Sequence, residues 1–191
     1  MKPMMWPHFD PVLVRVGPFA IHYYALAYIT ALLIGWRIVR RLVSLNPVAA
    51  TGEQVDDFLT WATLGIILGG RLGYVLFYQP IFFLTHPSRM IAVWDGGMSF
   101  HGGFIGVTIA IIWFCRKNKI AILRFADRVA VTVPIGLFLG RLANFINGEL
   151  WGRPAAAWFP FPMIYPQSGS LVPRYPSELI EACLLYTSPS P

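Results

Sequence analysis

The sequence has little charge. Only 13% of its 191 residues are charged, 15 of them basic and 9 acidic, whereas 56% are hydrophobic. A soluble globular domain has about a quarter of its residues charged. This composition, with a mean hydropathy of +0.58, excludes an ordinary soluble domain and predicts an integral membrane protein.

Cysteine is also scarce, since Cys115 and Cys183 are the two in the chain. Two cysteines imply no disulfide framework. Neither His8 nor His86 has a cysteine or carboxylate cluster nearby in the sequence, so no metal site is expected. Residues 1–10 hold two prolines and little apolar continuity, so they do not match a cleavable signal.

Basic residues and aromatic rings are abundant. The formal net charge is +6, and Trp, Tyr and Phe number 7, 8 and 14. In a membrane protein these features are typical of cationic anchoring at the cytoplasmic face, contact with anionic lipid and rings at headgroup level. We therefore expect lipid as a partner and no nucleic acid.

The hydrophobic runs predict an all-α polytopic bundle that forms a single membrane domain over residues 1–191. A span needs about 20 predominantly apolar residues. The chain offers four such runs, an external segment at 148–176 and the start of a fifth helix at about 177–186. The four spans are expected at about 18–36, 58–78, 98–115 and 129–147.

Cationic clusters orient these spans. Arg37, Arg40 and Arg41 directly follow the first span, and Arg116 and Lys117 end the third. By the positive-inside rule both ends are cytoplasmic, which places the N-terminus outside.

Local signals sharpen two of the boundaries. Thr51 and Gln54 form a capping-box pattern ahead of the second span. Ser177 follows Pro176 and is a reasonable N-cap for the fifth helix. The sequence GGRLG at 69–73 permits close helix approach.

The connecting segments are less regular. Alternating apolar residues at 12–16 suggest a brief strand or an interfacial segment before a turn at Gly17 and Pro18. Residues 80–95 are expected as an external loop, and the proline-rich residues 148–176 as an external head.

With this topology, polar side chains from all four spans reach a similar depth near the outer surface. Polar groups at membrane depth are costly, so their convergence predicts a functional site that opens toward the outer leaflet. Arginine binds phosphate in a bidentate way, and asparagine both donates and accepts, which suits a phospholipid headgroup. The converging residues are Tyr24, Arg71, His101, Arg141, Asn144 and Glu149.

Each of these residues also has a purely structural interpretation. Arg141 could pair with Glu149 or Asp95 to hold helices together. Arg71 could equally form a helix-packing ion pair. His101 could be a packing histidine with its hydrogen bonds satisfied.

Two further positions have equally plain explanations. Tyr24 could be an ordinary interfacial aromatic. Asn147 and Gly148 could simply form the C-terminus of the fourth span and the turn after it.

Four ordered stretches resemble one protein family. Residues 140–153, GRLANFINGELWGR, closely resemble the signature of bacterial prolipoprotein diacylglyceryl transferases. Three further stretches are similar to that family: HYY at 22–24, GGRLGY at 69–74 and WDGGMSFHGG at 94–103. The resemblance covers about residues 10–181.

The resemblance implies a multi-pass enzyme of the bacterial plasma (inner) membrane with its site toward the outer leaflet. Such enzymes move the diacylglyceryl group of phosphatidylglycerol onto the lipobox cysteine of a preprolipoprotein, and glycerol phosphate leaves. Catalytic roles would fall to His101, Tyr24 and Arg141. No metal or organic cofactor is expected. The lipid would be bound by Arg141, Asn144, Glu149, Gly152 and Arg71.

The sequence departs from the family pattern in three ways. Ala143 stands where glycine is usual, and Tyr175 stands where histidine often appears. Family members continue through further helices that carry another essential arginine, and the residues after Ala182 do not resemble the family. We therefore expect this chain to be an incomplete, inactive copy. The competing hypothesis is a lipid-binding or transport module without covalent chemistry.

Overall fold

The computed structural model describes residues 2–16, 19–93 and 96–187. Contacts divide the chain into two compact units, one formed by Met1–Gly35 with Val131–Pro191 and the other by Trp36–Ala130. Each unit is described by itself.

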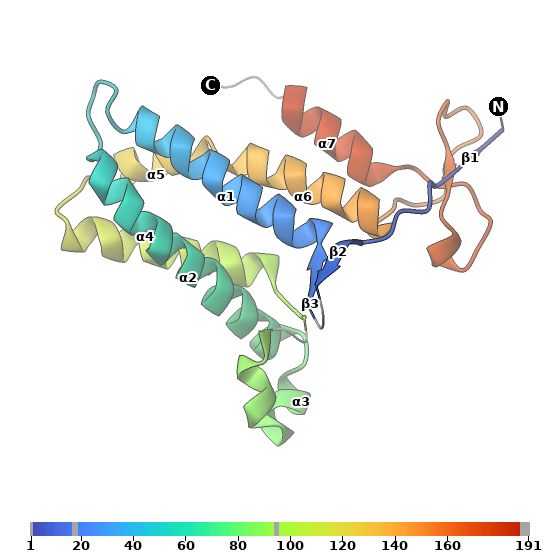
Figure 1. The fold of residues 1–191 in the computed structure, drawn as a ribbon, viewed down its shortest axis with the longest axis horizontal. Coiled ribbons are helices and arrows are strands. Elements are labelled where there is room, and N and C mark those ends of the chain that lie inside the picture. The colour runs from blue at the N-terminus through green and yellow to red at the C-terminus, as the bar shows by residue number, and fades with distance from the viewer. Residues whose placement is uncertain (1, 17–18, 94–95, 188–191) are drawn as a thin grey trace. The chain divides into compact units, whose positions relative to one another are not determined.

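The chain is mainly helical (Figure 1). Two stretches are long and apolar enough to cross a membrane, namely Gly52–Phe77 and Ile122–Asn147. The helices are α1 Tyr23–Leu42, α2 Gly52–Phe77, α3 Pro80–Thr85, α4 Phe100–Lys117, α5 Ile122–Ala130, α6 Val133–Asn147 and α7 Ser177–Thr187, with short 3-10 turns η1 Pro87–Ile91 and η3 Pro166–Ser168.

The first unit combines α6 and α7 with two small sheets. Strand β2 (Val12–Val16) pairs antiparallel with β3 (Phe19–His22), and β1 (Met4–Met5) pairs parallel with β4 (Met163–Ile164). The Trp6 indole packs against Met163 and Tyr165 and donates to the Phe145 carbonyl at 2.8 Å. The N-terminal segment is therefore fastened to the end of α6.

The second unit is built around the packed pair α2 and α4 (Figure 1). Their contact is a row of glycines. A Cβ on Gly65 would lie 2.8 Å from the Gly106 carbonyl oxygen, and one on Gly73 would lie 2.7 Å from the Gly102 Cα. The glycines let the two backbones touch, which confirms the prediction that residues 69–73 permit close helix approach.

At the other end of these helices an aromatic core closes the unit. Phe125 of α5 is fully buried and lies 5.0 Å, centroid to centroid, from Phe58 of α2. Phe114 of α4 lies 5.4 Å from the same ring. The three rings join α2, α4 and α5.

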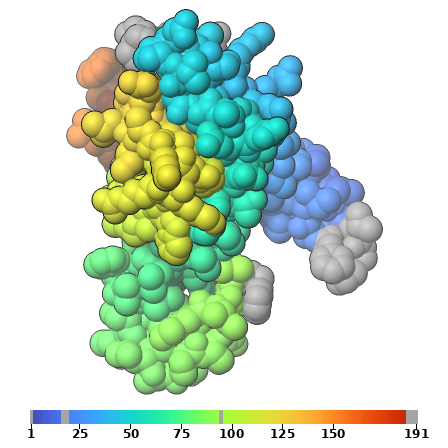
Figure 2. All heavy atoms as spheres, turned by 90° about the vertical axis from the view of Figure 1, so that its left-hand side faces the viewer, coloured from blue at the N-terminus to red at the C-terminus, as the bar shows by residue number. Residues whose placement is uncertain are grey.

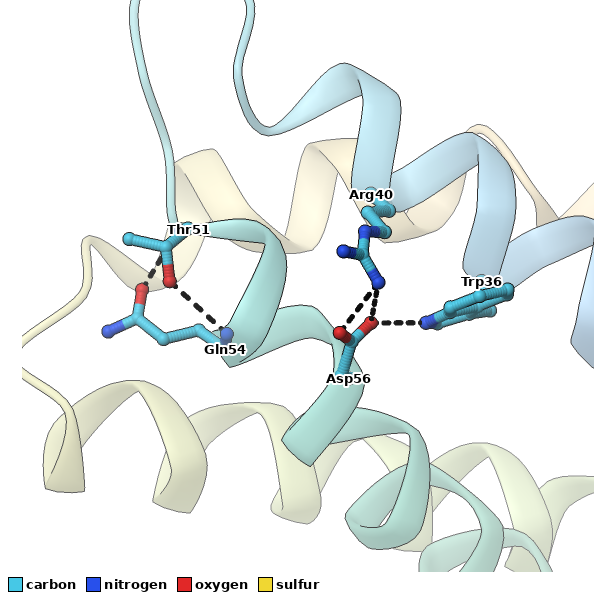
Figure 3. A network of polar contacts seen from close by, with 5 residues as sticks. All are labelled: Trp36, Arg40, Thr51, Gln54 and Asp56. Carbon is cyan, nitrogen blue, oxygen red and sulfur yellow. Dashed lines mark hydrogen bonds and ion pairs between the residues drawn. The ribbon is translucent and has the colours of Figure 1, made fainter.

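Polar contacts fix the start of α2 (Figure 3). Thr51 and Gln54 form the predicted capping box, with backbone–side-chain distances of 2.9 and 3.2 Å. One turn on, the Asp56 carboxylate accepts from the Trp36 indole at 2.7 Å and from the Arg40 guanidinium at 2.6 Å. This carboxylate ties the end of α1 to α2 within the second unit.

Several helix boundaries differ from those expected from the hydrophobic runs. The first helix begins at Tyr23 because residues 19–22 form a strand, and it continues to Leu42 with Arg37, Arg40 and Arg41 inside it. The region predicted as an external loop at 80–95 contains α3 and η1, which form a small lobe at the Phe77 end of α2 (Figures 1 and 2).

The later boundaries also differ. The fourth span, predicted at 129–147, corresponds to α6, which begins at Val133 after a turn at Val131 and Thr132 that separates it from α5. Ser177 does not cap α7, because it is the first helical residue and its hydroxyl donates to the Leu150 carbonyl at 3.1 Å. The turn predicted at Gly17 and Pro18 lies outside the described residues.

Candidate functional site

The polar stretch at the end of α6 is held by a tight helix terminus. Gly148 adopts the left-handed conformation with φ 64°, and its amide donates to the Asn144 and Phe145 carbonyls. Glycine takes this conformation without a Cβ penalty. The predicted helix end at Asn147 and Gly148 is confirmed.

Arg141 points from α6 to α7. Its Nη2 lies 2.6 Å from Glu181 Oε2, and the two side chains are 31% and 45% exposed. The structure thus gives Arg141 a carboxylate partner, but that partner is neither Glu149 nor Asp95, the residues considered from the sequence; Asp95 lies outside the described residues. Half-exposed ion pairs contribute little stability, so this contact leaves the guanidinium free to exchange partners.

Asn144 lies one turn from the end of α6 and is only 5% exposed. Its backbone carbonyl accepts from the Glu149 amide at 3.0 Å. Its side-chain oxygen, Oδ1, is buried and accepts no hydrogen bond from the described residues. A buried acceptor without a donor costs about 1–3 kcal/mol, so a water or a ligand that donates fits this position.

Glu149 and Tyr24 complete the polar face of the first unit. The exposed Glu149 carboxylate accepts from Asn147 Nδ2 at 3.1 Å. Tyr24 is the second residue of α1, and its hydroxyl lies 3.5 Å from that of Tyr28. Tyr24 is within electrostatic range of both Glu149 and Arg141. The structure therefore brings three of the predicted site residues together within one unit.

Gly152 has a packing role. Its amide donates to the Tyr175 carbonyl at 2.9 Å, and a Cβ on Gly152 would lie 2.8 Å from that same oxygen. Only a residue without a side chain fits against this backbone. Gly152 thereby fixes the chain that follows the polar stretch.

Arg71 is buried in the second unit, with 6% of its surface exposed. Its guanidinium donates to the carbonyls of Met90 at 2.9 Å, Arg89 at 2.7 Å, Gly97 at 3.1 Å and Gly96. Its face lies 5.3 Å from the Phe83 ring. This arrangement anchors the segment that leads into α4 and favours a structural role over headgroup binding.

His101 is the second residue of α4, which Ser99 caps by accepting from the Gly102 amide at 3.2 Å. The ring is exposed and contacts Phe100 edge-on at 5.8 Å. No hydrogen bond joins it to another residue in the described ranges. It is therefore an accessible imidazole at a helix start, as the sequence predicts. Trp94, in the same motif, lies outside the described residues.

Sequence reasoning missed a buried pair beside α7. The Tyr165 hydroxyl donates to Glu178 Oε1 at 2.6 Å, and both residues are 0% exposed. Burial, and then the bond to Glu178, raise the pKa of the Tyr165 hydroxyl above its ordinary value, so it stays a donor. Glu181, the partner of Arg141, was also assigned no role. Neither contact has a local sequence signal, because each joins residues far apart in the chain.

Metal binding has no support in the described part of the chain. It contains no group of three or more His, Cys, Asp or Glu side chains that could hold an ion. Tyr24, Arg141, Asn144 and Glu149 of the first unit instead offer a phenol, a guanidinium, an amide and a carboxylate, which suit an anionic ligand with hydroxyl groups.

Comparison with known proteins identifies the family. Residues 11–187 match the family described as prolipoprotein diacylglyceryl transferase. Proteins named phosphatidylglycerol–prolipoprotein diacylglyceryl transferase are 75% identical in Acidiphilium cryptum, 63% in Gluconacetobacter diazotrophicus and 56% in Gluconobacter oxydans. The alignments cover 94%, 95% and 94% of this chain and 65%, 64% and 66% of those relatives, so the chain spans about two-thirds of their length. With its apolar helices and its signature at 140–153, the chain belongs to the prolipoprotein diacylglyceryl transferase family, a family of bacterial membrane enzymes.

Proposed function

We propose that this chain carries the phosphate-binding part of an enzyme that transfers a diacylglyceryl group from phosphatidylglycerol to the lipobox cysteine of a preprolipoprotein. The observation that carries the proposal is the family match over residues 11–187. The polar group at the end of α6, with Arg141 beside a buried Asn144, supports it.

The reaction sets clear demands on such a site. The cysteine sulfur forms a bond to the glycerol carbon that bears the phosphate ester, and the carbon–oxygen bond there breaks. The electron pair leaves with glycerol phosphate, and the thiol proton goes to a base. A free cysteine has a pKa of about 8.5, so a base or cation near the thiol is needed to form thiolate at neutral pH.

Arg141 is assigned to the phosphate. A guanidinium fork matches phosphate oxygens and stabilises the charge that grows on the leaving group. Glu181 holds the guanidinium at 2.6 Å. Phosphate would then replace a half-exposed carboxylate, which is a favourable exchange because such ion pairs are weak.

Asn144 is assigned to the glycerol headgroup. The headgroup carries hydroxyls that donate, and Asn144 Oδ1 is a buried acceptor that lacks a donor among the described residues. Glu149 is assigned to the same site, and Gly152 to fixing the chain beside it through the Tyr175 carbonyl. Tyr24, within electrostatic range of Arg141, and the exposed His101 are the candidates for moving the proton.

The proposal includes a topology. Four spans carried by α1, α2, α4 and α6, with the N-terminus outside, would place the cationic ends of the first and third spans at the cytoplasmic face. In a bacterial inner membrane the site would then open toward the outer leaflet. Tyr24 and Arg141 lie in the first unit and Arg71 and His101 in the second, so their convergence in one site remains a prediction.

The test measures thioether product by mass spectrometry, with phosphatidylglycerol vesicles and a lipobox peptide. We compare this chain with a chimera. In the chimera, the part of the Acidiphilium relative that lies outside the alignment is joined to this chain. Product from the chimera and none from the 191-residue chain would support both the transfer chemistry and the expectation of an incomplete copy.

Three variants of the chimera assign the residues. Arg141→Gln should abolish product and weaken phosphatidylglycerol binding, whereas Glu181→Gln should leave that binding equal or tighter because it releases Arg141. Arg124→Gln is the charge-matched control, because Arg124 is exposed and belongs to the second unit. If both the chain and the chimera bind phosphatidylglycerol selectively but neither forms product, the transfer function is refuted and the lipid-binding module is favoured.

A further inference from the structure

A groove lies at the end of α4, within the second unit and outside the residues assigned to the reaction. Its volume is about 550 Å³, and it is lined by Ile109, Ile112, Trp113, Arg116 and Lys117. On one side of α4, two apolar turns are therefore followed directly by two cationic residues.

The groove walls are open to the surroundings. Ile109 is 58% and Trp113 57% exposed, and both Arg116 and Lys117 are exposed. No acidic side chain is among the lining residues. An unbalanced positive charge at the end of an apolar trough is complementary to an amphiphile with an anionic head.

Aromatic packing places Lys117 at the groove rim. The Trp113 ring lies 5.6 Å from the Trp61 ring of α2, and Lys117 Nζ lies 5.9 Å from the centroid of that same Trp61 ring. A cation over an indole face is held electrostatically. Trp61 therefore orders both the indole wall and one of the two charges.

If α2 spans the membrane, the groove on α4 faces the bilayer. α2 is one of the two candidate spans, and α4 packs along it from Gly102 to Phe114. Tryptophan and cationic side chains at a helix end are typical of the headgroup level of a bilayer. The apolar turns before them then face acyl chains.

We propose that this groove binds an anionic phospholipid, with the headgroup phosphate on Arg116 and Lys117 and an acyl chain along Ile109, Ile112 and Trp113. Arginine offers the phosphate a bidentate contact and lysine a second charge. Two cations against one phosphate leave a positive excess, which disfavours a zwitterionic choline lipid.

The site is distinct from the reaction and goes beyond the proposed function. In the proposed topology this end of α4 is cytoplasmic, whereas the reacting lipid lies in the outer leaflet. The lipid of the groove is therefore a structural ligand, drawn from the same chemical class as the substrate but held on the opposite face.

The test counts lipids retained by the detergent-solubilised 191-residue chain in native mass spectrometry, with phosphatidylglycerol or phosphatidylcholine added at equal concentration. The groove variant is Arg116→Gln with Lys117→Gln. The matched control is Lys119→Gln with Arg124→Gln, which removes the same charge from exposed residues outside the groove. We expect the groove variant to bind phosphatidylglycerol at least about tenfold more weakly, since it loses both charge-assisted contacts to the phosphate.

Two further variants separate the possible outcomes. Trp113→Ala keeps both charges and should also weaken phosphatidylglycerol retention several-fold. Arg141→Gln removes the proposed substrate contact, so a lipid that survives it and disappears with the groove variant belongs to the groove. Equal losses in groove and control variants, unchanged retention in the groove variant, or equal retention of phosphatidylcholine would each overturn the proposal, whatever the outcome of the transfer assay.

Discussion

Replacing Arg71 by methionine should release the segment that leads into α4. Methionine keeps much of the side-chain length but removes a guanidinium that donates to the carbonyls of Arg89, Met90, Gly96 and Gly97. Hydrogen bonds to charged groups contribute about 1.5–3 kcal/mol each, but the freed carbonyls regain water when the segment opens. We therefore expect a loss of about 3 kcal/mol, less than the sum of the separate bonds.

This loss should appear as local opening. A change of about 3 kcal/mol corresponds to a roughly 100-fold increase in the open population. Hydrogen–deuterium exchange should report it at amides that bond within or next to the segment, such as Ala92, Gly96 and Ser99. Exchange in α6 and α7 should not change, because they belong to the first unit.

The control and the contrary result are well defined. Arg124→Met removes an exposed arginine and should leave exchange in residues 89–99 unchanged. If Arg71→Met leaves that exchange at the wild-type rate but weakens phosphatidylglycerol binding, the anchoring argument is refuted and the headgroup role expected from the sequence is favoured.

Three other substitutions test the packing. Gly69→Ala should destabilise the chain by about 1–3 kcal/mol, because the new Cβ would lie 2.9 Å from the Gly106 Cα. The control Gly136→Ala should be neutral or stabilising, because its Cβ would meet no described atom within 4 Å. Equal melting temperatures of the two variants would contradict this reasoning. Asp56→Asn should cost about 1 kcal/mol in thermal unfolding by weakening its bonds to Trp36 and Arg40, and the exposed Asp57→Asn should cost nothing measurable. Tyr165→Phe should cost about 1–3 kcal/mol in denaturant unfolding because it leaves buried Glu178 without its donor, with Tyr78→Phe as the exposed control. Since the pKa of Tyr165 is raised on folding, its contribution should be constant from neutral pH to about pH 10 and decline above it; a decline already at neutral pH would argue against the assignment.

Local features were predictable from sequence. The capping box at Thr51 and Gln54 involves neighbours in the chain, and Gly148 ends α6 because glycine alone adopts its conformation without strain. The glycines at 69–73 predicted a close helix contact, although the partner glycines Gly102 and Gly106 were identified only in three dimensions.

Other features depend on contacts without a sequence signature. Residues 19–21 are apolar, and a short apolar run does not distinguish a strand from the first turn of a membrane helix. Arg71 bonds to backbone carbonyls, which every residue carries. Arg141 finds Glu181 across forty residues, so the sequence could predict that a carboxylate pairs with it but not which one.

The glycine row between α2 and α4 also fixes the register of the two helices. Where backbones touch, a slide of α4 by less than one turn, about 5.4 Å, would drive side chains of one helix into the backbone of the other. Arg71 and His101 each adjoin a glycine of this region, and the Ser99 amide bonds to the Gly70 carbonyl at 2.9 Å. The axial offset between the anchored guanidinium and the accessible imidazole is therefore set by the main chain, and any adjustment of His101 toward a substrate must come from rotation of its own side chain.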